Sequence, residues 1–285
     1  MKLCRYGQPG QEKPGIVDAD GTLRDLSGVI ADLTIATLPQ ALAADVASLP
    51  VVEGTPRYGV PISGISKIVA IGLNYRDHAI ESGLPIPTEP VMFAKALSSL
   101  SGPNDDVVLP KGSTHSDWEV ELGVIIGKTC RYVAKEDALD AIAGFTLVND
   151  VSERFNQKER GSQWSKGKGH DTFCPTGPWL VTPDEVGNAQ DLDMTLDVNG
   201  VRMQTGNTKT MIFDLAELIS YASEYVTLMP GDLVITGTPP GVGEGKKPDK
   251  IFLKAGDGMA LSIAKLGTQT QTVVEWHHLG EGKLA

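Results

Sequence analysis

The fold prediction rests on one stretch of the chain, Asp117-Trp118-Glu119-Val120-Glu121-Leu122-Gly123-Val124-Ile125-Ile126-Gly127. Side chains alternate across a β-strand with a rise of about 3.3 Å per residue, so Glu119 and Glu121 point to the same side, about 7 Å apart. The run 122–126 carries no charge, which predicts a strand that enters the core. Two ionised carboxylates at the mouth of a buried strand need a counterion.

A second strand supplies a third acid. The segment 143–149 is apolar, β-branched and aromatic, and it ends at Asp150. Acids from two strand ends could surround one cation, and all-oxygen ligands suit Mg2+, Mn2+ or Ca2+ better than zinc. In the alternative interpretation, Glu119 and Glu121 form a solvated strand edge and Asp150 caps the following helix. Spacing alone leaves both interpretations open.

Composition excludes several classes of protein. The 285 residues contain 25 basic and 36 acidic side chains, a net charge of -11, without a basic tract, which argues against nucleic acid and anionic membranes as partners. No apolar run is long enough to span a bilayer or to serve as a signal peptide, so we expect a soluble, cytoplasmic protein. Cys4, Cys130 and Cys174 are odd in number and far apart, which predicts reduced packing residues.

The chain divides into two predicted domains. Residues 1–65 form a small N-terminal domain, with short strands near 2–6 and 15–17 and a helix over 38–49. A Pro- and Gly-containing linker leads to an apolar strand at 67–73, and the main domain covers residues 66–285. Within it we expect a type I′ hairpin turn at Asn199-Gly200 and an amphipathic helix over 212–226.

The strand at 67–73 runs into a polar segment that ends at Gly83, which predicts a short helix or lid turn. His78 and Glu81 are three residues apart and would share one helical face. Such a pair can transfer protons, because the carboxylate fixes the imidazole tautomer while the ring takes a proton from water. An ordinary surface pair is the alternative.

Two glycine-rich stretches need interpretation. Lys166-Gly167-Lys168-Gly169 is expected to be a flexible loop that could bring an ammonium group to a ligand. The stretch 237–247 resembles a phosphate loop only superficially, because Pro240 and Lys247 stand where a Walker motif needs Gly and Ser or Thr. Its backbone amides and Thr238 could still bind a carboxylate.

Five motifs together resemble the fumarylacetoacetate hydrolase family. In order they are Gly72-Leu-Asn-Tyr-Arg-Asp-His-Ala-Ile-Glu81, Asp117-x-Glu119-x-Glu121-Leu122, Val148-Asn149-Asp150, Lys168-Gly-His-Asp-Thr-Phe-Cys-Pro-Thr-Gly-Pro-Trp179 and Thr236-Gly-Thr-Pro-Pro-Gly-Val242. The resemblance covers roughly residues 67 to 276. It implies an α+β, mainly β fold, the family's mixed β-sandwich roll, and a homodimer.

The resemblance also implies roles for nine residues. Expected metal ligands for Mg2+ or Mn2+ are Glu119, Glu121 and Asp150; expected catalytic residues are His78, Glu81 and Lys168; expected substrate-binding residues are Arg154, Gln157 and Thr238. One departure is Ser152-Glu153, where many members carry Thr-Ala, and it is expected to place an extra charge beside the pocket.

The implied activity is hydrolysis of a small-molecule 2,4-diketo acid at the bond between C3 and C4. Within the family the resemblance is to hydrolases of sugar-acid catabolism, with L-2,4-diketo-3-deoxyrhamnonate as the expected substrate and pyruvate and lactate as products. Alternatives on the same metal site are oxaloacetate decarboxylation and a ureidoglycolate lyase activity. A metal-dependent binder without catalysis is a further alternative, but pure binding does not need the proton-transfer pair.

Overall fold

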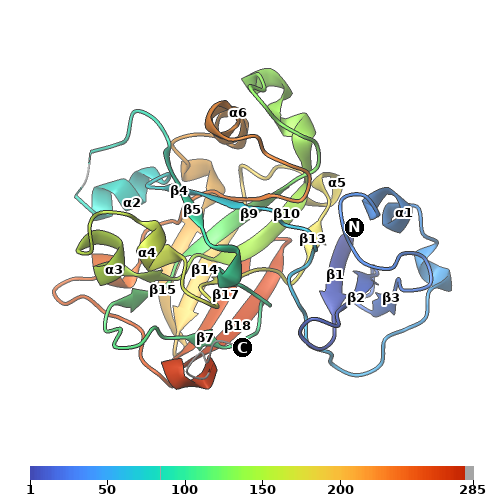
Figure 1. Cartoon of the computed structure of the whole chain (residues 1–285), viewed down its shortest axis with the longest axis horizontal. Coiled ribbons are helices and arrows are strands. Elements are labelled where there is room, and N and C mark those ends of the chain that lie inside the picture. The colour runs from blue at the N-terminus through green and yellow to red at the C-terminus, as the bar shows by residue number, and fades with distance from the viewer. Residues whose placement is uncertain (84, 280–285) are drawn as a thin grey trace, which may run out of the picture.

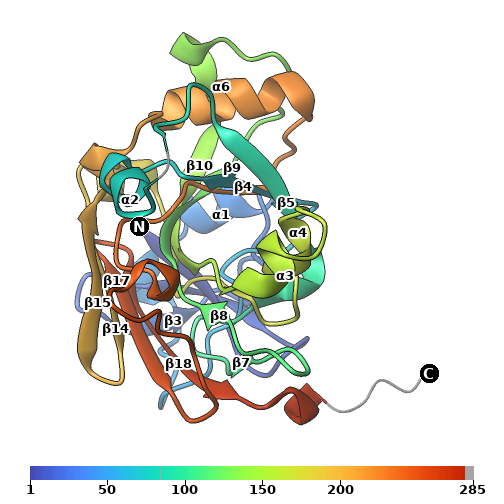
Figure 2. The ribbon, with the colours of Figure 1, turned by 90° about the vertical axis from the view of Figure 1, so that its left-hand side faces the viewer.

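The computed structural model describes residues 1–83 and 85–279, and it is mainly β with a few short helices (Figures 1 and 2). The largest sheet has nine strands in the order β3 (Leu23–Asp25), β2 (Lys13–Val17), β1 (Lys2–Tyr6), β13 (Leu180–Val181), β10 (Ile142–Asn149), β9 (Val120–Ile126), β16 (Leu233–Ile235), β4 (Ile68–Gly72) and β5 (Val91–Lys95). A five-stranded sheet has the order β15 (Val201–Asn207), β14 (Asp193–Val198), β17 (Gly258–Ile263), β18 (Gly267–Val274) and β7 (Val107–Val108). This mixed, layered β architecture confirms the predicted fold class.

Two small sheets and the helices complete the fold. The small sheets pair β11 (Ser152–Glu153) with β8 (Ser116–Asp117), and β12 (Cys174–Pro175) with β6 (Leu100–Ser101). The α-helices are α1 (Leu38–Leu42), α2 (Arg76–Glu81), α3 (Arg154–Lys158), α4 (Ser165–Lys168), α5 (Pro183–Val186) and α6 (Leu215–Tyr225). Short 3-10 helices cover Val46–Ser48, Leu97–Ser99, Lys135–Ala141, Thr208–Thr210, Gly243–Gly245 and Trp276–Leu279. In the described ranges, no helix combines the length and apolarity needed to cross a bilayer.

Strand β9 is buried on both faces, as its uncharged run predicts. Leu122 and Val124 belong to the core between the two large sheets, together with Leu196 of β14. Ile125 points the opposite way and packs in a second core with Ile16 from the N-terminal segment. This alternation places Glu121 on the same side of the strand as Ile125, at the end where the strand begins.

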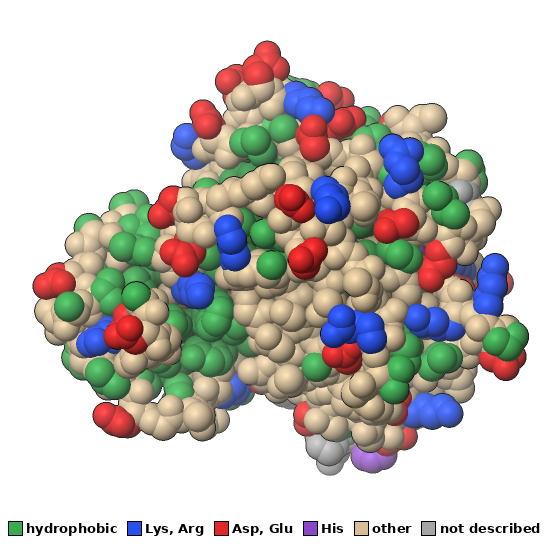
Figure 3. Space-filling model, turned by 180° about the vertical axis from the view of Figure 1, so that it is seen from behind, with side chains coloured by type: hydrophobic (Ala, Val, Ile, Leu, Met, Phe, Trp, Pro, Cys, Tyr) green, Lys and Arg blue, Asp and Glu red, His purple; other side chains and the backbone are tan. Residues whose placement is uncertain are grey.

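The N-terminal segment continues the nine-stranded sheet. Strand β1 pairs antiparallel with β13, with Leu3 opposite Leu180, and the blue strands in Figure 1 lie beside the main body. The division into domains at residue 65 stays a prediction. From behind, hydrophobic side chains gather most densely over the lobe that this segment forms, while charges of both signs are scattered over the rest (Figure 3).

The predicted helix over 38–49 is wrong in its second half. Helix α1 ends at Leu42, and Asp45 adopts an extended conformation before the turn Val46–Ser48. Leu38 and Ala41 are buried, whereas no residue of the later turn is, so burial does not hold a longer helix.

Two other local predictions are confirmed. The hairpin turn has positive φ at both Asn199 (51°) and Gly200 (74°), as type I′ requires. Helix α6 begins after Asp214, whose carboxylate accepts a hydrogen bond of 2.8 Å from the Glu217 N–H, and it packs one apolar face on the sheet.

Candidate active site

The three predicted metal ligands come together at the start of β9. One oxygen from each of Glu119, Glu121 and Asp150 lies within 4.8 Å of the other two. The antiparallel register of β9 and β10 causes this, because it sets Val148 opposite Glu121, and the Asp150 N–H donates to the Glu119 carbonyl at 2.8 Å. All three side chains are buried, so the interpretation as a solvated strand edge is excluded.

The three carboxylates, called the acid triad below, differ in their electrostatics. Burial and the neighbouring charges of Asp150 and Glu119 raise the pKa of Glu121 well above its usual range. Burial also acts to raise the pKa of Glu119, but the charges of Lys168 and Arg154 outweigh it and the pKa is lowered. Oxygen-only donors crowded in this way fit a hard divalent cation, whose charge would replace the protons that the site otherwise favours.

Lys168, and not Lys166, faces the acid triad. Its Nζ donates to Glu119 Oε2 at 2.8 Å and to Asp150 Oδ2 at 2.6 Å. The exposed Lys166 instead donates to the Arg160 carbonyl at 2.8 Å. The prediction of a flexible loop is wrong here, because residues 165–168 form the short helix α4, which fixes the direction of both side chains.

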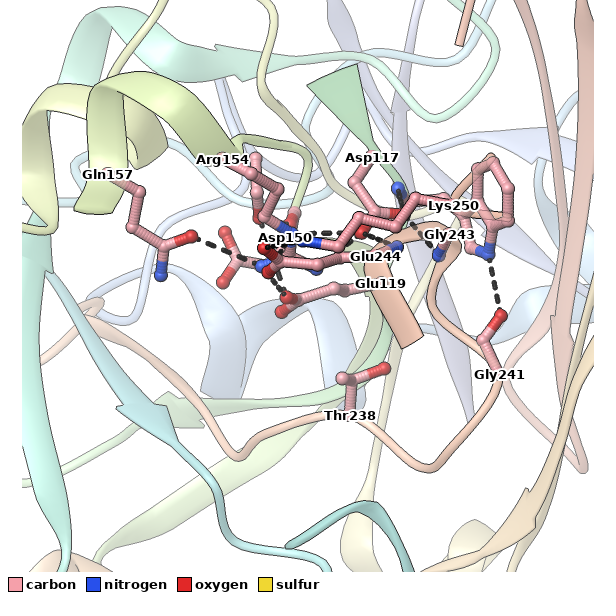
Figure 4. Close-up of polar contacts among 12 residues, drawn as sticks. Asp117, Glu119, Asp150, Arg154, Gln157, Thr238, Gly241, Gly243, Glu244 and Lys250 are labelled. Carbon is pink, nitrogen blue, oxygen red and sulfur yellow. Dashed lines mark hydrogen bonds and ion pairs between the residues drawn. The ribbon is translucent and has the colours of Figure 1, made fainter. Parts of the chain in front are cut away.

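Helix α3 brings two predicted substrate-binding residues to the same place. Arg154 forms an ion pair with Glu119, with 2.7 Å between Nη1 and Oε1, and it donates a hydrogen bond to Gln157 Oε1 at 3.2 Å (Figure 4). Burial acts to lower the pKa of the Arg154 guanidinium, but the charges of Asp117 and Glu119 raise it further above its usual range. The guanidinium therefore carries a permanent positive charge beside the acids.

His78 and Glu81 form the predicted pair on α2. His78 Nδ1 lies 3.3 Å from Glu81 Oε2, and the Gly241 N–H donates to both Glu81 oxygens at 3.0 Å. Burial acts to raise the pKa of Glu81, but the hydrogen bonds from His78 and Gly241 lower it. Glu81 is thus held as a carboxylate, which suits it to orient the imidazole.

A pocket of about 550 Å³ joins these groups. Eight of the nine predicted residues line it: His78, Glu81, Glu119, Glu121, Arg154, Gln157, Lys168 and Thr238. Asp150 is buried and does not line the pocket, although one of its oxygens lies within 4.8 Å of the other two acids. The Thr238 hydroxyl is already engaged, since it donates to the Val120 carbonyl at 2.9 Å and accepts from Gln204 at 2.8 Å.

Sequence reasoning missed two buried residues of the site. Lys95 donates to Asp150 Oδ1 at 2.5 Å, and Asp117 pairs with Arg154 at 2.8 Å. The signal for Lys95 was a single charge at the end of the apolar strand β5. Asp117 lay within the quoted motif, but its partner is 37 residues away in sequence.

The expected extra charge beside the pocket is wrong. Glu153 does not line the pocket; its Oε2 accepts from the Asn156 N–H at 2.6 Å, and its Oε1 accepts from the His115 N–H at 3.2 Å. A carboxylate that directly precedes a helix satisfies the free amides of the first turn, and Glu153 occupies that position before α3.

The mixed β fold with a buried acid triad defines a class of metal-binding protein, and comparison with known sequences identifies the family. Residues 67–274 match the family model for the fumarylacetoacetate (FAA) hydrolase C-terminal domain, and the chain belongs to this family.

Individual relatives support the same assignment. The chain is 76% identical, over 281 residues covering 99% of both proteins, to 2,4-didehydro-3-deoxy-L-rhamnonate hydrolase from Sphingomonas sp. (strain SKA58). Among solved structures it resembles fumarylacetoacetate hydrolase from Exiguobacterium antarcticum, with 33% identity, a TM-score of 0.87 and coverage of 96% and 99%. It also resembles maleylpyruvate hydrolase from Sphingobium sp. SYK-6 in complex with manganese(II) and pyruvate, with 31% identity, a TM-score of 0.79 and the same coverage.

Proposed function

We propose that this protein is a metal-dependent hydrolase that cleaves L-2,4-diketo-3-deoxyrhamnonate between C3 and C4 and releases pyruvate and lactate. The observation that carries the proposal is the meeting of the acid triad with the His78–Glu81 pair in one pocket. The relative with 76% identity supports the choice of substrate, because its name designates the same 2,4-diketo acid in systematic form.

We propose Mg2+ or Mn2+ as the cofactor, held by Glu119, Glu121 and Asp150. When bound, such an ion supplies positive charge for the 2-oxo acid end of the substrate and for the enolate that develops as the bond breaks. The donor set supports this proposal, since it offers carboxylate oxygens alone and the raised pKa of Glu121 marks an excess of negative charge.

His78 and Glu81 are proposed to activate water. Glu81 holds the Nδ1 side of the imidazole, which leaves Nε2 to take a proton from the water that attacks the C4 carbonyl. The oxygen adds to C4, the C3–C4 bond breaks, and its electron pair passes to C3 of the pyruvate enolate. A proton then returns to C3, so the atoms of one water appear in the two products.

The remaining residues are proposed to bind and orient the substrate. Lys168 uses two of its three N–H groups on Glu119 and Asp150, and the third can donate to the oxyanion that forms at C4, helped by Gln157. Arg154 supplies a guanidinium for an anionic group of the substrate. For Thr238 we propose that the side chain contacts the substrate as part of the pocket wall and not through a hydrogen bond, because its hydroxyl already has two partners.

The experiment that tests this proposal identifies the products from a set of substrates. Purified protein with Mg2+ receives L-2,4-diketo-3-deoxyrhamnonate, oxaloacetate or ureidoglycolate in parallel. We expect pyruvate and lactate in equal amounts from the first, at a rate well above the other two. Faster pyruvate and carbon dioxide formation from oxaloacetate would replace the hydrolase with a decarboxylase, in which no water attacks and the His78–Glu81 pair has no role.

We further propose that the chain acts in the cytoplasm as a homodimer. Three large apolar side chains around α6 and the turn Lys135–Ala141 are well exposed: Tyr132 (69%), Leu139 (53%) and Tyr225 (58%). Exposed apolar side chains that lie near each other favour a protein contact. Light scattering coupled to size exclusion should give a mass of two chains, and a mass of one chain would contradict this part of the proposal.

A further inference from the structure

One loop binds a carboxylate of the acid triad and the carboxylate of the His78–Glu81 pair. The loop 237–245 follows β16, and its backbone N–H groups point at side chains that come from distant parts of the sequence. Gly237 donates to Glu121 Oε2 at 2.8 Å, and Gly241 donates to both oxygens of Glu81. The same loop therefore fixes one member of the acid triad and the carboxylate of the proton-transfer pair.

The same loop also binds a third carboxylate, that of Asp117 from β8. Asp117 Oδ1 accepts from the Gly243 N–H at 2.6 Å and Oδ2 accepts from the Glu244 N–H at 3.0 Å. Oδ2 also accepts from Arg154 Nε at 2.9 Å (Figure 4). Asp117 is fully buried and does not line the pocket, so it touches the substrate only through other residues.

The path of the loop leaves little freedom for rearrangement. A Cβ atom added at Gly243 would stand 1.9 Å from the Ile251 carbonyl oxygen, and one at Gly245 would stand 2.9 Å from Glu81 Cδ. Gly241 has φ of +107°, a conformation that side chains disfavour. Because the loop packs this closely, a shift of its Gly243 end should be transmitted to Gly241 and Glu81.

We infer that Asp117 is a positioning residue that sets Arg154 and the loop 237–245 relative to each other, and thereby couples substrate binding to the placement of the His78–Glu81 pair. The inference rests on the proposed function for the roles of Arg154 and Glu81. An asparagine at this position has the same size but only one acceptor oxygen. If its NH2 group took the place of Oδ1, it would face the Gly243 and Trp118 N–H groups. If it took the place of Oδ2, it would face both the Glu244 N–H and the Arg154 guanidinium. In either orientation, hydrogen bonds that hold the loop are lost.

The kinetic test compares Asp117→Asn with Asp232→Asn. Asp232 is a matched control, since it too is fully buried and accepts backbone N–H groups and a basic side chain. Its partners Lys67 and Met229 do not line the pocket, whereas Arg154 and Glu244, the partners of Asp117, do. With L-2,4-diketo-3-deoxyrhamnonate we expect Asp117→Asn to raise KM by about 10- to 100-fold, the loss of a charged hydrogen bond, with Mg2+ affinity unchanged. Asp232→Asn should keep KM and kcat within about twofold. Equal kinetics in the two variants would overturn the inference.

A second measurement needs no substrate, and its first part uses the wild-type protein alone. In wild-type protein, hydrogen exchange of the Gly243 and Glu244 amides should be slow, although these residues lie in a loop, because Asp117 accepts both N–H groups. In Asp117→Asn, exchange should rise in 237–245 and in α2, while Asp232→Asn should leave both segments unchanged. Wild-type amides that exchange at the rate of an open loop would overturn the inference. A wild-type protein without hydrolase activity would refute the proposed function alone.

Discussion

Two groups of charged side chains in this molecule follow opposite rules. The first, called the N-terminal ion-pair cluster, consists of Arg5, Glu12, Asp32, Arg57 and Asp105. Arg57 lies 3.0 Å from Glu12 and 2.6 Å from Asp105, and Arg5 lies 2.7 Å from Asp32. Acids and bases alternate, so every carboxylate has a guanidinium next to it.

In the acid triad this alternation is incomplete, because Glu119 and Asp150 share Lys168 while Glu121 lies between them and a backbone N–H. Its three carboxylates each place an oxygen within 4.8 Å of the others. Glu121 accepts a hydrogen bond from the Gly237 N–H. The ammonium groups of Lys168 and Lys95 both bind Asp150. The pKa of Glu121 stays raised. Paired charges stabilise the fold, whereas crowded charges are tolerated for a ligand that compensates them.

The largest expected effect is on turnover, and the accompanying change in stability should have opposite signs in the acid triad and in the N-terminal ion-pair cluster. Glu121→Gln should lower turnover by about 10^4-fold, because a lost metal ligand removes several kcal/mol of transition-state stabilisation. The metal-free variant should be at least as stable as the wild type, since a repelled charge is gone. Turnover assays and thermal unfolding in EDTA measure both. A variant with wild-type turnover would remove Glu121 from the metal site.

A smaller loss is expected for the proton-transfer pair. His78→Ala should reduce hydrolysis by about 10²- to 10³-fold, the contribution of one general base, while Mg2+ affinity measured by calorimetry stays unchanged. Lys166→Ala is the matched control, because this exposed lysine donates to the Arg160 carbonyl and points away from the acid triad, and it should retain full activity. Unaltered hydrolysis in His78→Ala would show that another group activates the water.

Asp232, a buried carboxylate outside the site, should make the free energy of unfolding depend on pH in the acid range. Burial acts to raise the pKa of Asp232, but hydrogen bonds from Lys67 and Ser66 lower it below its usual range. Its stabilising contribution is therefore present above the pKa of the unfolded chain and is lost as pH falls through the folded pKa.

Asp232→Asn should cost about 1–3 kcal/mol at neutral pH, and the difference from wild type should shrink as the pH falls below about 4. Chemical denaturation at a series of pH values measures this. A cost that stays constant down to pH 2 would contradict the assignment of the acid-dependent stability to this carboxylate.

The smallest effect belongs to the N-terminal ion-pair cluster. Glu12→Gln should lower the free energy of unfolding by about 1 kcal/mol, because Arg57 keeps Asp105 and Arg5 keeps Asp32 as partners. Turnover should not change, and added salt should narrow the difference from wild type. Loss of activity in this variant would contradict this expectation and would connect the N-terminal segment to the site.

Much of the site could be predicted because its signals are local. Alternation along one strand places Glu119 and Glu121 together, and three-residue spacing on a helix pairs His78 with Glu81. Placing Asp150 beside them required the assumption that the second apolar strand ends near the mouth of the first. The antiparallel register of β9 and β10 confirms that assumption.

The rest depends on contacts that sequence spacing does not reveal. Asp117 and Arg154 meet through tertiary packing, and so do Lys95 and Asp150, 55 residues apart. The extra charge at Glu153 was expected beside the pocket, but Glu153 caps the start of α3 instead. The predicted helix over 38–49 failed because Asp45 adopts an extended backbone conformation, which interrupts the alanine-rich segment despite its helix propensity.

The measurement that tests the account most directly is turnover during a metal titration. Protein stripped with EDTA and freed of chelator receives L-2,4-diketo-3-deoxyrhamnonate, and Mg2+ or Mn2+ is added stepwise. We expect no product at first, and then pyruvate and lactate in equal amounts as the acid triad fills. Full activity in the stripped protein, or no pyruvate at saturating metal, would contradict a metal-dependent hydrolase at this site.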